Sequence, residues 1–186
     1  MPKVTRRGFS LAEVLITLAI IAILMAMLLP AVNSQLGKGD ATRAANDLVA
    51  VQTGIQSFTA DVHRLPQSIS QLTTKITTSS NDLANPLAAP IPDYLVANWR
   101  GPYVNRDAAG ANRIGNIQDA FSVTRVPAVG NPFVDYVTIT MTLVSRQDFV
   151  EIEKILDEGT TDATSTTAGL VRYSGTTLTF LAVPIM

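Results

Sequence analysis

The chain begins with a long hydrophobic run that lies along a single predicted helix. Residues 14–32 include one threonine, Thr17, and no charged side chain. As an α-helix that rises about 1.5 Å per residue, this run spans close to the ~30 Å of a bilayer hydrocarbon core. The pattern therefore predicts a membrane-spanning helix near the N-terminus.

Further along, apolar side chains recur at steps of three and four residues, which is typical of one face of a helix. The positions are Ala41, Ala44, Ala45, Leu48, Val51, Ile55, Phe58 and Val62. Pro30, Gly37 and Gly39 are poor helix residues, so we expect a weak zone between the two halves. The sequence predicts one helix of about 50 residues that ends near Leu65–Pro66 and packs its second half on the rest of the chain.

The remaining patterns are those of short strands and loops. Residues 137–143 alternate apolar side chains with threonine, which predicts a strand with one buried and one solvent-facing side. Residues 170–173 and 177–183 predict a hairpin through Ser174–Gly175. Residues 66–98 predict loops with a short helical piece at 68–72. The fold class predicted is α+β, with one long N-terminal helix packed on a small antiparallel β-sheet.

A short amphipathic helix is predicted over residues 148–158, with Gly159 as its end. Its buried face is expected to contain Phe149, Ile152, Ile155 and Leu156, and its solvent face Glu151, Glu153, Asp157 and Glu158. The threonine-rich residues 160–167 predict an exposed loop.

The residues before the apolar run are basic, with Lys3, Arg6 and Arg7. Basic residues before a span and a polar region after it predict a cytoplasmic N-terminus and an exported C-terminal part. An ordinary signal peptide has a shorter apolar run of about 7–15 residues and a small-residue cleavage site, which this sequence lacks. A plain single-span anchor remains open.

Glu13 is the unexpected residue, because it lies at the edge of the apolar run. A carboxylate there costs on the order of a few kcal/mol if it is left unpaired. It either finds a positive partner in a dry environment or reaches the lipid headgroups, and both interpretations remain open at this stage.

The run Gly8-Phe9-Ser10-Leu11-Ala12-Glu13 resembles the processing site of type IV pilins and type II secretion pseudopilins. The resemblance implies that a prepilin peptidase cuts between Gly8 and Phe9 and that Phe9 becomes N-methylated. It also implies that Glu13, the fifth mature residue, pairs with the Phe9 amine of a neighbouring subunit and sets the register of assembly. Pro30 falls where many members of this family have a helix-kinking proline.

The resemblance further implies the domain organisation, location and partners. Residues 1–8 would be a leader peptide, 9–36 a transmembrane and filament-core helix, and 37–186 an exported pilin-like domain. The expected location is the bacterial inner membrane, as a single-pass protein with a periplasmic C-terminal domain, and then a periplasmic or extracellular filament. The expected partners are further copies in a helical filament, other pseudopilins, the prepilin peptidase and an inner-membrane assembly platform.

Over residues 8–103 the sequence is similar to the major pseudopilin of type II secretion. The matching residues are Asp47–Leu48, Asp61, Leu65–Pro66 and Trp99-Arg100-Gly101-Pro102-Tyr103. The resemblance then weakens, because residues 129–133 replace the usual Asp-Pro-Trp-Gly-type motif that accompanies a calcium loop. Asp107, Asp119 and Asp135 are candidate calcium ligands, but their spacing is not that of a compact loop. A type IV pilus subunit, or a minor subunit that binds a secreted substrate or DNA, is the alternative.

Composition limits the other functions. Removing Lys3, Arg6 and Arg7 leaves 11 of the 14 basic residues against 15 acidic ones, a side-chain charge of −4. Without a basic run beyond the leader, nucleic-acid binding is not expected. The chain has no cysteine, which excludes disulfides and cysteine-ligated metals. His63 is the single histidine and no nucleophile accompanies it, so we expect a non-enzyme without a cofactor, and a solvent-facing His63.

Overall fold

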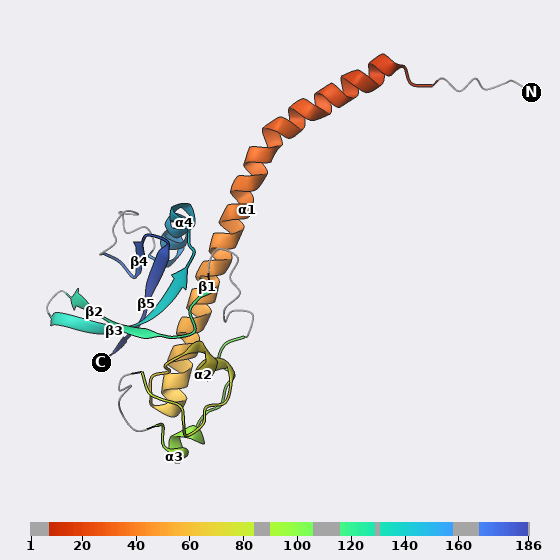
Figure 1. Cartoon of the computed structure of the whole chain (residues 1–186). Helices are drawn as coiled ribbons and strands as arrows, with labels where there is room; N and C mark the ends of the chain where they lie inside the picture. The colour runs from red at the N-terminus through yellow and green to blue at the C-terminus, as the bar shows by residue number, and fades with distance from the viewer. Residues whose placement is uncertain (1–7, 84–89, 106–115, 129–130, 158–167, 186) are drawn as a thin grey trace, which may run out of the picture. The chain divides into compact units, whose positions relative to one another are not determined.

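The computed structural model of the chain describes residues 8–83, 90–105, 116–128, 131–157 and 168–185, with the backbone alone at residues 31, 33–37, 127–128 and 131–132. The chain forms two compact units, Met1–Lys38 and Gly39–Met186. Helix α1, Leu11–Val62, passes from one unit to the other (Figure 1). Its 52 residues confirm the predicted length. The backbone remains helical through Pro30 and both glycines, so the expected weak zone does not interrupt it.

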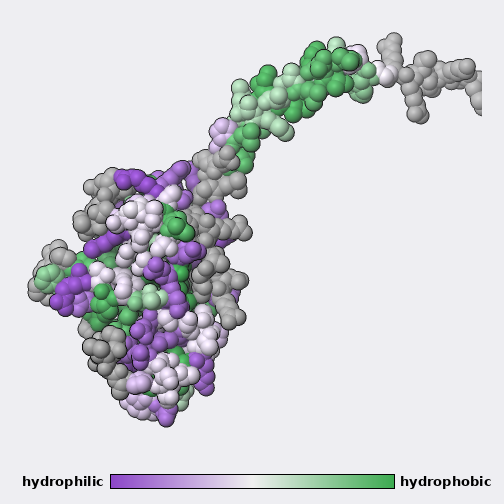
Figure 2. Space-filling view, in the orientation of Figure 1, coloured by the Kyte–Doolittle hydropathy of each residue, from purple (hydrophilic) through white to green (hydrophobic). Residues whose placement is uncertain are grey.

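In the first unit, α1 is apolar on all sides. The segment Leu11–Pro30 is long and apolar enough to cross a membrane, and none of it is buried. Its large hydrophobic side chains are exposed by between 46% and 78%, and Figure 2 shows them as a nearly unbroken hydrophobic surface. Soluble monomers rarely expose so much apolar surface, so this segment requires lipid or other protein chains around it.

In the second unit, α1 is apolar on one face only. The eight residues that the periodicity selected, from Ala41 to Val62, are all completely buried. Side chains three and four residues apart share one side of a helix, so these positions form a continuous stripe. The prediction of an amphipathic second half is therefore confirmed at every position.

The stripe packs on a five-stranded antiparallel sheet. Its strands are β1 (Asn116–Ile117), β2 (Ser122–Ala128), β3 (Asn131–Thr142), β4 (Val171–Ser174) and β5 (Thr177–Ile185). The order is β1-β3-β5-β4, and β2 also pairs with β3 (Figure 1). The chain is thus α+β with a long helix on a small antiparallel sheet, as the sequence predicted.

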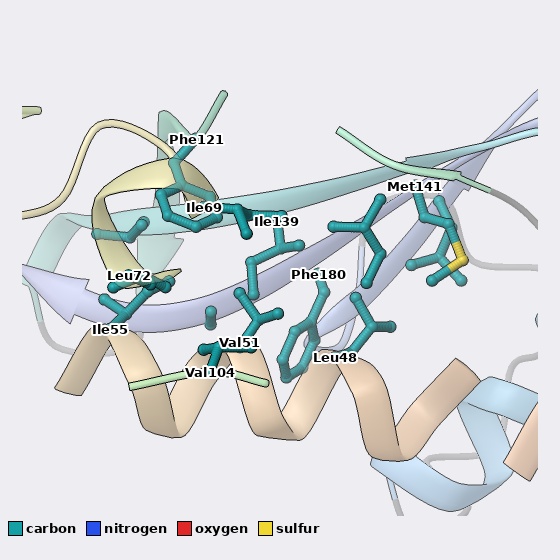
Figure 3. Packing of buried hydrophobic residues seen from close by; sticks show 14 of the residues in the cluster. Leu48, Val51, Ile55, Ile69, Leu72, Val104, Phe121, Ile139, Met141 and Phe180 are labelled. Carbon is teal, nitrogen blue, oxygen red and sulfur yellow. The ribbon is translucent and has the colours of Figure 1, made fainter. Parts of the chain in front are cut away.

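The hydrophobic core lies between α1 and this sheet. Leu48 and Val51 of α1 face Ile139 and Phe180 of the two central strands (Figure 3). Alternate residues of β3 and β5 point toward α1, which explains why threonines take the intervening positions. Gln52 also donates a hydrogen bond to the Ala182 carbonyl and so ties α1 to β5.

The strand predicted at 137–143 is confirmed over residues 137–142 as the second half of β3, which spans Asn131–Thr142. Two positions differ from the prediction: Leu143 lies after the strand and is 68% exposed, and Thr138, expected on the solvent-facing side, is buried. The predicted terminal hairpin is confirmed as β4 and β5, with Gly175 in the turn at a φ of +64° that glycine adopts without strain. Strand β2 was not predicted. Its register with β3 shifts between Val126 and Ala128. Pro127 lies at this shift, and a proline within a run argues against a strand when the sequence alone is considered.

Helix α4 spans Arg146–Leu156, two residues earlier than predicted. Ser145 caps it by accepting a hydrogen bond from the Asp148 amide at 3.2 Å. Phe149 and Ile152 are buried as expected, but two assignments were wrong: Glu153 is buried and Ile155 is 42% exposed. The face of α4 that packs on the sheet is therefore centred differently from the face that its hydrophobic residues suggested. Residues 158–167, which include Glu158 of the expected solvent face and Gly159, lie outside the described residues.

The region between α1 and the sheet has the predicted irregular character, with two short helices, α2 (Ile69–Thr73) and α3 (Asp93–Val96). An aromatic cluster fixes it to α1. The Tyr103 ring packs edge-on against Trp99 and Phe58, with centroids 5.7 and 5.8 Å apart. The Tyr103 hydroxyl donates to Asp61 Oδ2 at 2.9 Å, and the Trp99 indole donates to the Gln71 carbonyl at 3.0 Å. Trp99 and Tyr103, two of the residues that match the major pseudopilin, thus combine ring packing with hydrogen bonds that hold this region on the last turns of α1.

Gly54 allows this segment to lie close to α1. A Cβ at position 54 would overlap Cγ2 of Val104 and touch the Tyr103 carbonyl. By contrast, a Cβ at Gly39, also within α1, would meet nothing within 4 Å. Position 54 of α1 therefore has no room for a side chain, whereas position 39 has.

We expect Gly54→Val to destabilise the protein by about 1–3 kcal/mol, because it overpacks the contact with Val104. Gly39→Ala should instead stabilise it by about 0.5–1 kcal/mol, since alanine is the better helix residue and has free space there. Denaturant unfolding of the full chain in detergent micelles, followed through the fluorescence of the single tryptophan, measures both. Equal effects of the two substitutions would contradict the close contact at Gly54.

A second prediction concerns Tyr103. Burial, together with the hydrogen bond to Asp61, raises the pKa of Tyr103 above its ordinary value. The folded state therefore holds the phenol proton more tightly than the unfolded state, so this contribution is complete below about pH 10 and is lost as the pH rises above it. Tyr103→Phe should cost about 1–3 kcal/mol near neutral pH and remove this part of the alkaline loss. Tyr94→Phe, at a site 69% exposed, is the matched control and should retain the wild-type alkaline profile.

Candidate functional site

The N-terminus of α1 contains a polar arrangement centred on Glu13. The Ser10 backbone amide donates to Glu13 Oε2 at 3.0 Å, and the Ser10 hydroxyl donates to the same oxygen at 3.1 Å. In return, the Glu13 amide donates to Ser10 Oγ at 3.2 Å. This reciprocal bonding is a capping box, in which serine at the N-cap and glutamate three residues later satisfy the free amides of the first turn.

The capping box gives Glu13 a structural role at the N-terminus of α1, which its charge alone did not indicate. The Ser-x-x-Glu spacing directly before an apolar run was visible in the sequence, and it is the signal that could have revealed this role. Both Ser10 donors bind Oε2, and among the described residues no donor is recorded on Oε1. No basic side chain of the described residues lies within 4.0 Å of Glu13. One oxygen of this carboxylate therefore remains available to a partner outside the described residues.

Gly8 and Phe9 lie immediately before the capped helix. Both are exposed, Phe9 by 88%, and neither belongs to a helix or strand. A Cβ at Gly8 would meet nothing within 4 Å. The bond between them is thus accessible, as a cleavage site must be. Cleavage and methylation here stay predictions.

Pro30 lies inside α1, 19 residues after its first residue. Proline cannot donate the hydrogen bond to the carbonyl four residues before it, here that of Ala26, and its ring crowds that carbonyl. The local hydrogen-bond ladder is therefore weaker at this point than elsewhere in the helix. The kink implied by the resemblance stays a prediction.

The calcium candidates are not brought together among the described residues. Asp119 accepts hydrogen bonds from the Ser70 amide and hydroxyl at 3.0 and 2.9 Å, and so caps the start of α2 from across the chain. Asp135 forms a two-point ion pair with Arg125 at 2.9 and 3.2 Å, which holds the pKa of Asp135 below its ordinary value. Asp107 lies outside the described residues. Within the described ranges, no group of three histidine or acidic side chains could hold a metal ion.

His63 ends α1 in the left-handed region, with a φ of +55°, and its side chain is exposed. Its amide donates to the Thr59 carbonyl at 2.9 Å, which closes the last turn. The prediction of a solvent-facing histidine at the helix end is confirmed. The structure also shows no nucleophile hydrogen-bonded to His63 in the part of the chain that it describes.

Known proteins share this N-terminal region. A family profile described as "Prokaryotic N-terminal methylation motif" matches residues 4–29. The chain is 26% identical over 102 residues to the type II secretion system core protein G of Escherichia coli (strain K12), which covers 54% of this chain and 63% of that protein. It is 30% identical over 95 residues to the protein of the same name in Aeromonas hydrophila, which covers 50% and 59%.

The match to a third protein of that name, from Klebsiella michiganensis, is 28% over 78 residues and covers 40% and 55%. No solved structure matches the chain. The chain thus spans less than two thirds of the curated relatives that it matches. It carries the prokaryotic N-terminal methylation motif and, over about half its length, is similar to type II secretion system core protein G, as its resemblance to the major pseudopilin predicted.

Proposed function

We propose that the chain is a structural subunit of a type II secretion pseudopilus, the piston-like filament for protein export across the outer membrane. One observation carries the proposal: the first half of α1 is exposed on all sides, while the second half of the same helix is covered by its own sheet. A helix with this division can insert its free half among copies of itself without unfolding the globular unit. The similarity to core protein G, whose name assigns it to this secretion system, agrees with the proposal.

Before assembly, Leu11–Pro30 holds the subunit in the inner membrane as a single span. The basic leader keeps the N-terminus in the cytoplasm and leaves the globular unit in the periplasm. Prepilin peptidase removes residues 1–8, and the inner-membrane assembly platform then transfers the subunit to the filament. Because lipid and a bundle of apolar helices have similar polarity, the helix moves between them at low cost in hydrophobic free energy.

Glu13 fixes the axial register between the α1 helices of neighbouring subunits, which apolar contacts alone do not determine. Cleavage creates an amine at Phe9, four residues before Glu13. The Phe9 amine of a neighbouring subunit binds the oxygen that the capping box leaves available, and a desolvated pair of this kind fixes register. The subunit has a structural rather than an enzymatic role.

A type IV pilus subunit is the second candidate. The profile that matches residues 4–29 describes the methylation motif itself and is not restricted to secretion. The processing and the packing of α1 would be the same in either filament. Export of a secreted enzyme in a strain that lacks the gene for this chain distinguishes them, because a pseudopilus subunit is required for export.

Processing is the first test. We expect the native protein to begin at methylated Phe9, which N-terminal sequencing and the intact mass of protein purified from membranes measure together. Protein from a strain without prepilin peptidase should keep residues 1–8 and is the matched control. An intact Met1 in the native protein of the peptidase-positive strain would contradict the proposal and favour a plain membrane anchor.

The charge of Glu13 is the second test. Glutamine can still accept the capping hydrogen bonds but has no charge, whereas alanine loses both functions. We expect Glu13→Gln and Glu13→Ala to insert and to be cleaved, and both to reduce filament recovery at least about tenfold, as for the loss of a buried charge pair. Filaments sheared from cells and measured by immunoblot give the yield.

Ser10→Ala completes this comparison, because it removes the serine hydroxyl from the cap and leaves the carboxylate charged. It should weaken the helix N-terminus by only about 1 kcal/mol and retain most of the filament yield. If Glu13→Gln assembles like the wild type, the carboxylate acts through the cap and the register role is wrong.

A further inference from the structure

The globular unit contains a partly buried carboxylate, Asp47, to which no described residue donates a hydrogen bond. Asp47 of α1 makes no hydrogen bond and no ion pair within 4.0 Å among the described residues. Arg43, one turn earlier, pairs with Asp40 at 4.0 Å and acts on Asp47 only through its charge. Burial raises the pKa of Asp47, and the charge of Arg43 offsets part of that effect. The carboxylate has lost part of its hydration and gains no donor in exchange within the described residues, so a donor from another molecule would stabilise it.

A second unpartnered charge has the opposite sign. Arg172 lies on β4, and its Nε is buried without a hydrogen-bond partner, the one such side-chain atom among the described residues. Its neighbours across the sheet are Thr179 on β5 and then Thr140 on β3, which are neutral. No carboxylate of the described residues forms an ion pair with it. Arginine loses hydration on partial burial and regains stability only from an acceptor.

These two charges lie on opposite sides of the sheet. Residues alternate between faces along a strand. Tyr173, next to Arg172, stacks on Phe149 of α4 with ring centroids 4.8 Å apart, and Val171 on its other side is fully buried in the core. Arg172 therefore lies on the face turned away from α1, the helix that contains Asp47. Strand β4 is also at the edge of the sheet (Figure 1), and the Arg172 side chain is only partly buried there.

We infer that Asp47 of one copy binds Arg172 of the next copy, an inference that rests on the proposed filament. The two groups are complementary in charge, and each is partly desolvated before the copies meet, which lowers the further cost of pairing them. Because the contact uses different residues on the two partners, it is heterologous. Such a contact can repeat from copy to copy without closing on itself, as a filament requires, whereas a symmetric contact stops at the dimer. Because every copy of the chain contains both Asp47 and Arg172, the two groups are always present in equal numbers.

Cross-linking tests the contact directly, since the chain has no cysteine of its own. Full-length protein with Asp47→Cys and Arg172→Cys, produced in cells with the secretion machinery, should give a ladder of disulfide-linked multimers on mild oxidation. Either single substitution should give monomer only. Gln56→Cys with Arg172→Cys is the matched control, because Gln56 is exposed and lies nine residues further along α1, on its opposite side.

Charge exchange provides the second measurement. We expect Asp47→Arg and Arg172→Asp each to lower the yield of sheared filaments at least about tenfold, and the double exchange to restore most of it. Rescue by the double variant requires an interaction between the two positions, which loss of folding in either single variant cannot produce.

The outcomes separate this inference from the proposed function. If wild-type filaments form but the 47/172 pair gives no ladder and the double exchange gives no rescue, this inference is overturned and the proposed function stands. If processed wild-type protein forms no filament at all, the proposed function fails. Dimers from one single-cysteine variant would indicate a symmetric contact. A ladder of equal strength from the Gln56 control would indicate nonspecific cross-linking. Cross-links to another protein would indicate that a different molecule binds there. Each of these three results overturns the inference.

Discussion

The structure depends on burying the apolar surface of α1, and the helix achieves this in two different ways. From Ala41 to Val62 the apolar side chains form one stripe, and the sheet of the same molecule covers it. From Leu11 to Pro30 the apolar side chains surround the helix, and no described residue covers them. Hydrophobic burial is roughly proportional to area and has no direction, so the second segment is stable in lipid or among other helices alike. In the proposed function, one segment can therefore serve both as a membrane anchor and as a filament core.

Polar groups then have to supply what apolar contacts cannot. Backbone amides at the start of α1 would be unsatisfied in a dry environment, and the Ser10–Glu13 box satisfies two of them, those of Ser10 and Glu13, within the chain. The same carboxylate keeps one oxygen available, so capping and pairing do not compete for the same lone pairs. A neutral glutamine at position 13 would accept the Ser10 hydrogen bonds equally well. The acid is therefore explained only when both uses are considered together.

The sequence predicted the parts of the fold that depend on local periodicity. The buried stripe of α1, the second half of β3 and the terminal hairpin all follow from regular spacing of apolar residues. The capping box could also have been predicted, because its spacing is local. Strand β2 could not, since its pairing with β3 is long-range and Pro127 interrupts its pattern. Glu153 likewise is buried because of where α4 packs on the sheet, which hydrophobicity along the helix does not determine.

Two levels of specificity follow from this division of the chain. Within the molecule, Tyr103, Trp99 and Asp61 clamp the irregular segment to α1 through directed hydrogen bonds, so the globular unit is held by more than hydrophobic contact. Between molecules, an apolar helix alone would permit many axial positions of nearly equal free energy. In the proposed filament, the charge pair at the start of the helix would select among these positions in steps along the axis, but it would leave rotation of the globular unit undetermined. A second directed contact, placed on the globular unit and away from the axis, would remove that remaining freedom.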